Sequence, residues 1–86
     1  MNKISSINTA KLSCLIKPKN NAYYVSMRAK EGYNVASIAK AYGGGGHIGS
    51  AAFMSNKPLK EIEQIILTEF RKQLYSFKPI SKKLFQ

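Results

Sequence analysis

A run of four glycines followed by a histidine, Gly43 to His47, interrupts this chain near its middle. Glycine loses more conformational freedom on folding than any other residue, and none of the four brings a side chain to a core. Gly43 is a natural end for the helical pattern that precedes it. Because a short apolar segment follows the run, we expect the chain to fold from short elements that pack around this interruption.

The length of 86 residues allows one domain, which buries about 60–65% of the surface that the unfolded chain exposes. The single cysteine, Cys14, has no disulfide partner within the chain. No apolar stretch approaches the roughly 20 residues of a membrane span, and the N-terminus shows no signal peptide. The sequence therefore predicts a soluble, cytoplasmic protein with no transmembrane segment.

The charge of the chain narrows the range of partners. Fourteen Lys and Arg residues stand against four acidic residues, which gives a formal net charge of +10. A field of this sign attracts polyanions such as short RNA or DNA, nucleotides, polyphosphate or an anionic membrane surface. The alternative is that the charge serves only solubility. Charge alone does not choose among these partners.

Three segments have the character of strands. Residues 12–16 and 23–28 are rich in apolar and β-branched or aromatic side chains, and turn residues separate them, so we expect them to pair. The short apolar segment 51–54 is expected to be a buried strand. The loop between this strand and the preceding helix holds the glycine run.

Two helices are expected from the spacing of apolar residues. The first covers 35–42, with the Asn34 side chain as its cap. The second opens near Pro58, because proline is accepted in a first turn, and ends by Pro79. Its apolar stripe consists of Leu59, Ile62, Ile66, Phe70 and Leu74.

These elements follow one another as β-β-α-loop-β-α. The order predicts a small α/β domain of the α+β kind, with a mixed sheet and the helices packed on it. Residues 1–10 are predicted to be a loose N-terminal lead-in, 11–75 the folded domain, and 76–86 a basic C-terminal tail.

Two phosphate-binding motifs can be tested against the glycine run. Residues 44–49 formally satisfy G-x-G-x-x-G, but the dinucleotide-binding motif needs a strand before the glycines and a helix after them. The run also lacks the Gly-Lys-Ser/Thr ending of a Walker loop. Two interpretations remain: a flexible loop tip, or a backbone that approaches an anion closely beside the His47 imidazole. The apolar flanks favour the anion site, because hinges usually lie between polar neighbours.

Three segments follow one another in a distinctive order: Val25-Ser26-Met27-Arg28, Asn34 to Tyr42, and Gly43 to Phe53. In this order they resemble the DHH-associated domain, the C-terminal, substrate-binding half of DHH-family phosphoesterases. The family pattern is a strand ending in Ser-x-Arg, a short helix, four glycines with a histidine, two variable residues and Ala-Ala-Gly-Phe. The similarity is close over about residues 22–55.

The resemblance implies that Arg28 contacts a substrate phosphate, a role that suits its two-pronged guanidinium. It also implies that the glycines hold the backbone against the ligand beside His47. A helix of eight residues, about 12 Å long, separates Arg28 from His47, so only the return of the loop can bring them together. The implied substrate-binding residues are Arg28, Gly43, Gly44, Gly45, Gly46 and His47, with Ser26 and Ser50 as secondary candidates.

Two positions depart from the family pattern. Ser50 stands where the family has its first alanine, and Ala52 stands in place of the family glycine. If that glycine adopts a positive φ or lets the backbone approach closely, the Ala52 methyl group is expected to strain or narrow the pocket.

The resemblance also bears on catalysis. The relatives are oligoribonucleases, adenosine bisphosphate phosphatases, single-strand exonucleases and exopolyphosphatases, whose catalytic half binds two metal ions through Asp and His residues. This chain has no Asp and a single His, so it is not expected to form a two-metal site or to hydrolyse phosphodiesters by itself. No cofactor is expected within the chain, and a divalent metal, Mn or Mg, is expected only in a separate catalytic domain.

Three functions remain open. The first is a binding module for phosphate-rich ligands, foremost short nucleic acid or nucleotides. The second is one part of a split phosphoesterase or exopolyphosphatase, with a DHH catalytic domain as partner. The third is a basic membrane-surface or polyanion-binding protein that uses its lysine-rich C-terminal end.

A homodimer is left open, and Cys14 is expected to be a buried structural thiol. The apolar tail residues are expected either to contact a catalytic partner or to pack into the core of the chain itself: Phe77, Ile80, Leu84 and Phe85.

Overall fold

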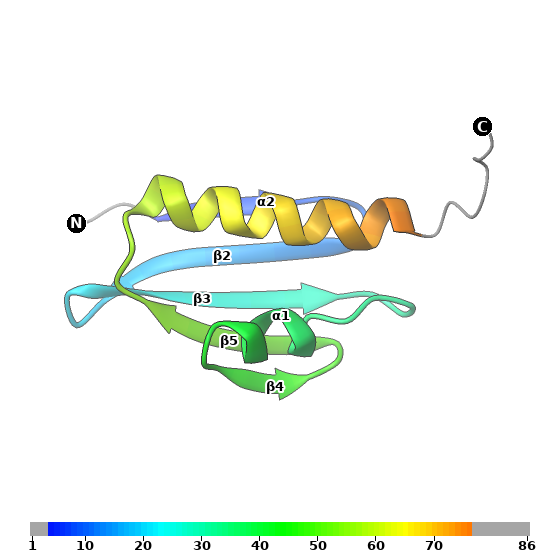
Figure 1. Cartoon of the computed structure of the whole chain (residues 1–86), viewed down its shortest axis with the longest axis horizontal. Helices are drawn as coiled ribbons and strands as arrows, with labels where there is room; N and C mark the ends of the chain where they lie inside the picture. Colours follow the sequence, from blue (N-terminus) through cyan, green and yellow to red (C-terminus); the bar gives the residue numbers. More distant parts are fainter. Residues whose placement is uncertain (1–3, 77–86) are drawn as a thin grey trace.

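The structure is a computed structural model, and it describes residues 4–76. Within these residues, five strands and two helices follow one another in the order β1-β2-β3-α1-β4-β5-α2 (Figure 1). Their bounds are Ser5–Asn8 for β1, Leu12–Lys19 for β2, Ala22–Ala29 for β3, Ala36–Ala41 for α1, Gly45–His47 for β4, Ser50–Ser55 for β5 and Leu59–Ser76 for α2.

The strands form one antiparallel sheet in the order β1-β2-β3-β5-β4. A two-residue turn joins β2 to β3, and its residues Asn20 and Asn21 have φ angles of 52° and 62°. Positive φ at both positions suits the right-handed twist of the flanking strands, and asparagine adopts it more readily than most residues. The turn thereby fixes the β2–β3 register, in which Ser13 lies opposite Arg28.

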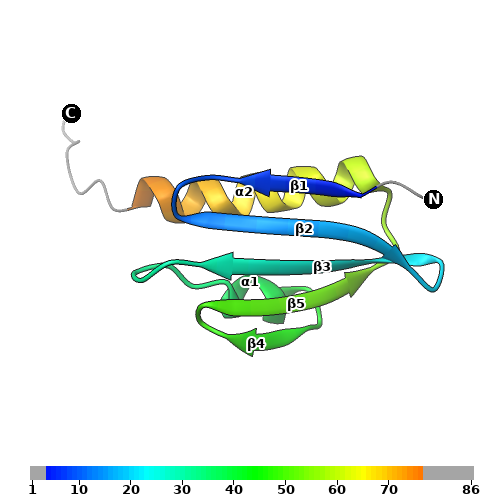
Figure 2. The same cartoon turned by 180° about the vertical axis from the view of Figure 1, so that it is seen from behind.

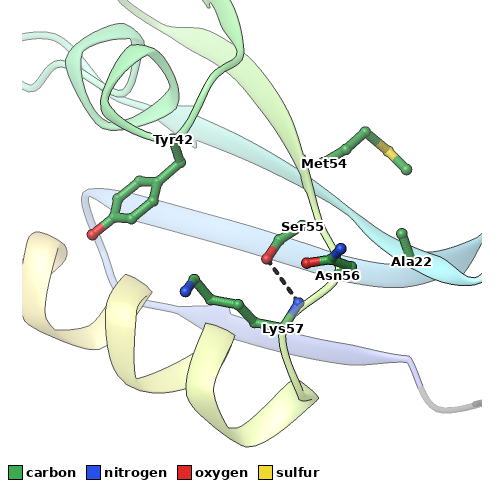
Figure 3. A pocket seen from close by; sticks show the side chains of 6 residues that line it. All are labelled: Ala22, Tyr42, Met54, Ser55, Asn56 and Lys57. Carbon is green, nitrogen blue, oxygen red and sulfur yellow. Dashed lines mark hydrogen bonds between the residues drawn. The ribbon is translucent and has the colours of Figure 1, made fainter.

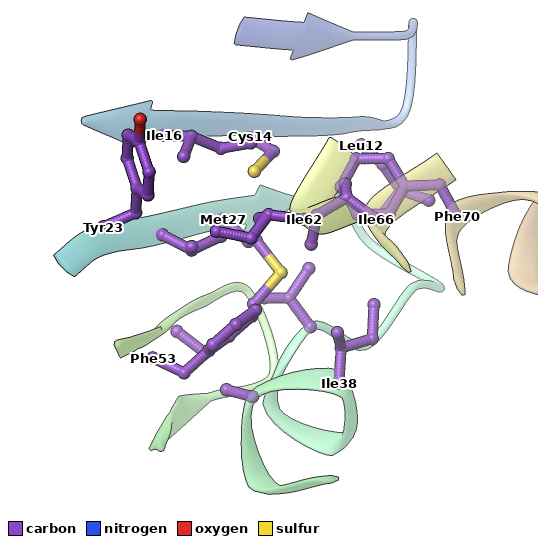
Figure 4. Close-up of a cluster of buried hydrophobic side chains, with 14 residues drawn as sticks. Leu12, Cys14, Ile16, Tyr23, Met27, Ile38, Phe53, Ile62, Ile66 and Phe70 are labelled. Atoms are coloured by element: carbon purple, nitrogen blue, oxygen red, sulfur yellow. The ribbon is translucent and has the colours of Figure 1, made fainter. Parts of the chain in front are cut away.

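Both helices lie on one face of the sheet (Figure 1), and the strands are uncovered when the molecule is seen from behind (Figure 2). Side chains along a strand alternate between the two faces. The buried core is Leu12, Cys14, Ile16, Tyr23, Val25, Met27, Val35, Ile38, Ala39, Ala51, Phe53, Ile62, Ile66 and Phe70 (Figure 4). We call the uncovered side the open face; its residues are Ser6, Asn8, Ser13, Leu15, Lys17, Lys19, Ala22, Tyr24, Ser26, Arg28, Gly45, His47, Ser50, Ala52 and Met54.

Helix α2 forms one wall of the core. Ile62, Ile66 and Phe70 recur every four residues and are 0%, 0% and 2% exposed, because this spacing places side chains on one helix face. Leu59 and Leu74 also pack against the core, so the apolar stripe predicted from the sequence is confirmed. Full burial of a side chain of this size contributes about 1.5–3 kcal/mol, and these contacts hold α2 on the sheet.

Helix α1 is anchored at its start. The Asn34 side-chain oxygen accepts a hydrogen bond from the Ser37 amide at 3.1 Å, the capping contact that the sequence predicts. The Gln73 side chain of α2 accepts a hydrogen bond from the Asn34 amide and donates one to the Asn34 carbonyl. These bonds tie the start of α1 to α2, and α1 then leads into the glycine run.

The α+β class predicted from the sequence is confirmed, with three differences. Strand β1 lies within residues 1–10, where a loose lead-in is expected, because its polar sequence hides the packing of Ile7 against the core. Strand β4 occupies the second half of the glycine run, where the low strand propensity of glycine conceals it. The sheet is antiparallel throughout, instead of mixed.

The described part of the chain contains no helix long and apolar enough to span a membrane. The basic tail predicted for 76–86 lies outside the described residues except for Ser76, the last residue of α2. The tail residues Phe77, Ile80, Leu84 and Phe85 lie outside them as well.

Candidate functional site

The register of the sheet brings three of the predicted site residues together on the open face. Arg28 on β3 lies opposite Ser50 on β5, and Ser50 lies opposite His47 on β4. Cross-strand partners point to the same face of a sheet. Arg28, Ser50 and His47 therefore form one row across three neighbouring strands, on the side shown in Figure 2.

The spacing within this row suits a small ligand. Neighbouring strands are about 4.8 Å apart, so the Cα atoms of Arg28 and His47 are about 10 Å apart across β5. Both residues are exposed. Helix α1 carries the chain away from β3, and the β4–β5 hairpin brings it back, with β5 next to β3. This return of the chain brings Arg28 and His47 together, as the sequence analysis requires.

The row continues on the other side of Arg28. Ser13 on β2 lies opposite Arg28, and Asn8 on β1 lies opposite Ser13. Every side chain in this row is able to donate a hydrogen bond. We call this set the polar row: Asn8, Ser13, Arg28, Ser50 and His47.

Two depressions flank Arg28 on the open face. One, of about 320 Å³, has Ser26, Arg28, Gly45 and Ser50 in its lining and extends over β3, β5 and β4. The other, of about 270 Å³, extends over β1, β2 and β3 and is lined by Ser13, Ser26 and Arg28 among others. Arg28 and the secondary candidate Ser26 thus line both depressions, and Arg28 is the central cation of the face.

Three neighbours of Arg28 escape the sequence analysis. A depression of about 120 Å³ beside Arg28 is lined by Lys11, Ser13 and Lys30, and the Lys30 amide donates to the Lys11 carbonyl at 2.9 Å. The signal that identifies Ser13 is the Asn-Asn turn, because a two-residue turn pairs positions equally distant from it on either strand. The two lysines lie in connecting segments, where no such pairing rule applies.

The acidic residues lie away from the polar row. Glu31 follows β3 in a turn, and the other three are on α2, on the opposite side of the sheet: Glu61, Glu63 and Glu69. The strands of the described chain contain no acidic residue. All formal charges on the open face are therefore positive, and they come from Lys17, Lys19 and Arg28.

The first half of the glycine run ends helix α1. The Gly43 amide donates to the Lys40 carbonyl at 3.2 Å, and the Gly44 amide donates to the Ala39 carbonyl at 2.8 Å. Gly43 has a φ of +87°. This pair of bonds with a left-handed glycine is the Schellman motif, a common helix end. Gly43 and Gly44 therefore lie at the end of α1, outside the polar row.

From Gly44 onward the run lies against β5. A Cβ atom at Gly44 would lie 2.1 Å from the Ala52 carbonyl oxygen, and one at Gly46 would lie 2.5 Å from the Ala51 Cα atom. Close packing on β5 thus accounts for glycine at positions 44 and 46. At Gly45, by contrast, an added Cβ would meet nothing within 4 Å. The bare backbone of Gly45 faces the 320 Å³ depression beside Arg28.

Ala52, which replaces the family glycine, lies on the open face between Ser26 and Gly45. It is not among the described residues with positive φ, so its methyl group causes none of the backbone strain considered above. The methyl group instead lines the 320 Å³ depression and narrows it.

The remaining reactive groups lie apart from the polar row. Cys14 is 3% exposed in the core, and this burial raises the pKa of its thiol to about 12. Within residues 4–76, no three His, Cys, Asp or Glu side chains gather closely enough to hold a metal ion. The row itself combines a guanidinium, an imidazole and hydroxyl groups, a donor set that suits an anion and repels a divalent cation.

Comparison with known proteins identifies the family of the chain. Curated protein sequences give no significant match. The family model of the DHHA1 domain matches residues 1–75. This span contains both the strand that carries Arg28 and the segment from Gly43 to His47. The chain belongs to the DHHA1 family, the DHH-associated domains of DHH-family phosphoesterases.

Proposed function

We propose that this chain is a binding module for phosphate-rich ligands, with short nucleic acid or a nucleotide as the favoured ligand. The observation that carries the proposal is the alignment of Arg28, Ser50 and His47 in one cross-strand row. The row lies on a sheet face whose formal charges are all positive. The DHHA1 family match supports the same role, because such domains accompany enzymes that act on phosphoesters.

Each group in the row has a distinct task. The Arg28 guanidinium donates two parallel hydrogen bonds to a phosphate, which fixes its orientation as well as its charge. The His47 imidazole and the Ser50 hydroxyl donate to the remaining oxygens from the other side. Because β4 is an edge strand, the Gly45 and Gly46 backbone next to the row is within reach of a ligand without a side chain in between.

A titration of labelled three-nucleotide RNA tests the proposal. We expect Arg28→Ala to weaken binding about tenfold or more, because it removes charge-assisted hydrogen bonds to a phosphate. His47→Ala is expected to weaken binding to a smaller extent. Arg71→Ala is the matched control, since Arg71 is an exposed arginine of α2 on the opposite side of the sheet. Equal affinity of the wild type and the Arg28→Ala/His47→Ala double variant would rule out the proposed site.

The family match supports a second role, in which the chain holds the substrate for a DHH catalytic domain that supplies the divalent metal. The polar row then presents a phosphoester to that domain, on the same or another polypeptide. The test is hydrolysis of a short RNA by a purified DHH domain with Mn²⁺, with and without the chain. Stimulation that Arg28→Ala removes supports this role, whereas a rate unaffected by the chain argues against it.

A further inference from the structure

The open face continues beyond the polar row along β3 and β5. Four residues before Arg28 on β3 is Tyr24, which lies opposite Met54 on β5 and opposite Lys17 on β2. Cross-strand partners share a face, so these three side chains form a second row on the open face. We call Lys17, Tyr24 and Met54 the far row.

The far row is apolar at its centre and cationic at its border. Met54 is 43% exposed, and Leu15, diagonal to Tyr24 on β2, is 40% exposed. The Tyr24 ring is half-buried beside them, with the Lys19 ammonium 5.3 Å from its centroid. Accessible aromatic rings bordered by cations are what single-stranded nucleic acid binds, because bases stack on the ring and phosphates pair with the cations.

The structure also provides space for a base next to the far row. A depression of about 410 Å³ opens at the end of β5 and has Met54 in its lining. Figure 3 shows Met54 and Ala22 on one side of the strand and Tyr42 and Lys57 on the other, so the depression continues the open face around the strand end. The Asn56 amide in the lining is able to donate and to accept hydrogen bonds from a base edge.

The contact between Lys19 and Tyr24 does not exclude a base from the ring. A cation over a ring at the surface of a protein is held weakly, and the stacking of a base on the ring is the stronger interaction. A base that takes the ring face releases the Lys19 ammonium. The flexible lysine stem then lets this charge reach a phosphate of the same strand.

The distance between the two rows determines the length of the ligand. Arg28 and Tyr24 are about 13 Å apart along β3, at about 3.3 Å per residue. Tyr24 also lines the 320 Å³ depression beside Arg28, which joins the two rows on the open face. We expect the phosphate held at Arg28 and the base stacked on Tyr24 to belong to neighbouring nucleotides. A mononucleotide satisfies the polar row alone, whereas a short strand laid along β3 reaches both rows.

We propose that the far row is a base-stacking subsite for single-stranded nucleic acid, occupied when another nucleotide of the same strand places its phosphate at the polar row. The inference rests on the proposed function and adds to it a ligand of more than one nucleotide. The charge of the face favours this occupant over a protein, because Lys17 and Lys19 border the apolar centre and no acidic residue lies in the described strands.

The test compares binding of adenosine monophosphate and of a three-nucleotide RNA to the full chain and its variants. Tyr24→Leu is expected to weaken RNA binding about tenfold, the effect of losing one stacked base, and to leave mononucleotide binding unchanged. Tyr24→Phe keeps the ring and is expected to bind like the wild type. Tyr75→Leu is the matched control, since Tyr75 is a tyrosine of α2 that is 63% exposed.

A second pair of variants serves if Tyr24→Leu fails to fold, as judged by circular dichroism. Lys17→Gln/Lys19→Gln removes two charges from the border of the far row. Lys40→Gln/Lys60→Gln removes the same charge from exposed positions of the two helices. The first pair is expected to weaken RNA binding more than the second. Equal losses of RNA affinity would show that the lysines attract RNA through the overall positive charge of the chain and form no subsite.

The outcomes separate this inference from the proposed function. Equal affinities of the wild-type chain for the mononucleotide and the RNA, or equal losses of both in Tyr24→Leu, overturn the far row and leave the polar row standing. Binding of both ligands that is insensitive to Arg28→Ala overturns the proposed function itself. Self-association that Met54→Lys abolishes and RNA does not reverse would assign the far row to a second copy of the chain, and so would also overturn the inference.

Discussion

At the scale of single residues, the glycine run divides into positions that serve the fold and one that leaves the open face clear. Gly43 ends α1, and Gly44 and Gly46 pack so closely on β5 that a Cβ atom at either would overlap its neighbours. Gly45 has open space where a side chain would be. Neighbouring glycines of the run therefore differ in how an added side chain would affect the stability of the fold, although the sequence does not distinguish them.

This difference predicts opposite outcomes for two matched variants. Gly44→Ala is expected to lower the free energy of unfolding by about 1–3 kcal/mol or more, because the new methyl group meets the backbone of Ala52. Gly45→Ala is expected to leave stability unchanged or raise it by about 0.4–1 kcal/mol. Urea denaturation followed by circular dichroism measures both values. Equal midpoints for Gly44→Ala and the wild type would show that the close packing is wrong.

Cys14 predicts a pH dependence of stability. Its thiol has a native pKa of about 12 against an ordinary value of 9.0, so the unfolded chain releases this proton at lower pH than the folded chain. The protonated thiol therefore contributes to the free energy of unfolding in full below pH 9. This contribution is lost between about pH 9 and 12, by up to about 1.4 kcal/mol per pH unit. Denaturation from pH 8 to 11 measures the loss. Cys14→Ala is the control, and its stability should fall less steeply over the same range.

At the scale of elements, the β2–β3 hairpin sets which residues share a row with Arg28. Its turn places both asparagines at positive φ, and the resulting register aligns Ser13 with Arg28 on the open face. A slip of one residue would turn every side chain of a strand to the opposite face. The turn therefore determines which β2 side chains lie beside Arg28, although it is far from Arg28 along the hairpin.

The turn geometry predicts the effect of substitutions at Asn21. Asn21→Gly is expected to preserve or raise stability, because glycine adopts positive φ without strain. Asn21→Val is expected to lower the free energy of unfolding by about 1–2 kcal/mol, the cost of the left-handed conformation for a residue with a bulky Cβ. Thermal melts of the two variants measure the difference. Valine and glycine variants of equal stability would be inconsistent with this turn.

Sequence patterns identified the elements that bury apolar stripes and missed those that do not. The α2 stripe and the paired strands around residues 12–16 and 23–28 could be predicted, because apolar residues at alternate positions of a strand, or every four residues of a helix, indicate a buried face. β1 and β4 are short edge strands with polar or glycine sequences, so they lack the alternation of apolar and polar residues that predicts a strand. Arg28 and His47 were identified by resemblance to a family motif. Their shared row depends on the pairing of β5 with β3, which local patterns do not encode.

At the scale of the whole molecule, the acidic residues of the described helices and strands all lie on one side of the sheet, where basic residues accompany them. Three of the four acidic residues lie on α2, while the formal charges of the open face are positive. Lys17, Lys19 and Arg28, three of the fourteen basic residues, lie on the open face. A polyanion approaching this face meets Arg28 with no acidic residue in the described strands.

The positive charge of the open face predicts how RNA binding depends on salt. The logarithm of the RNA binding constant is expected to fall linearly with the logarithm of salt concentration, with a slope of about −0.7 for each phosphate contacted on a single strand. Arg28→Ala is expected to make the slope shallower by about 0.7, whereas Arg71→Ala on α2 leaves it unchanged. Titrations at several salt concentrations measure the slopes. A slope that responds equally to both variants would mean that the charge acts without a defined contact.

The central claim is that phosphate binds at the polar row on the open face. The most direct test is a titration of the ¹⁵N-labelled chain with three-nucleotide RNA, followed by NMR chemical shifts. We predict that the largest shift changes occur at Arg28, Gly45, His47 and Ser50, and that the exposed side of α2 does not respond. Changes confined to α2, or none on β3, β4 and β5 at saturating RNA, would contradict the claim.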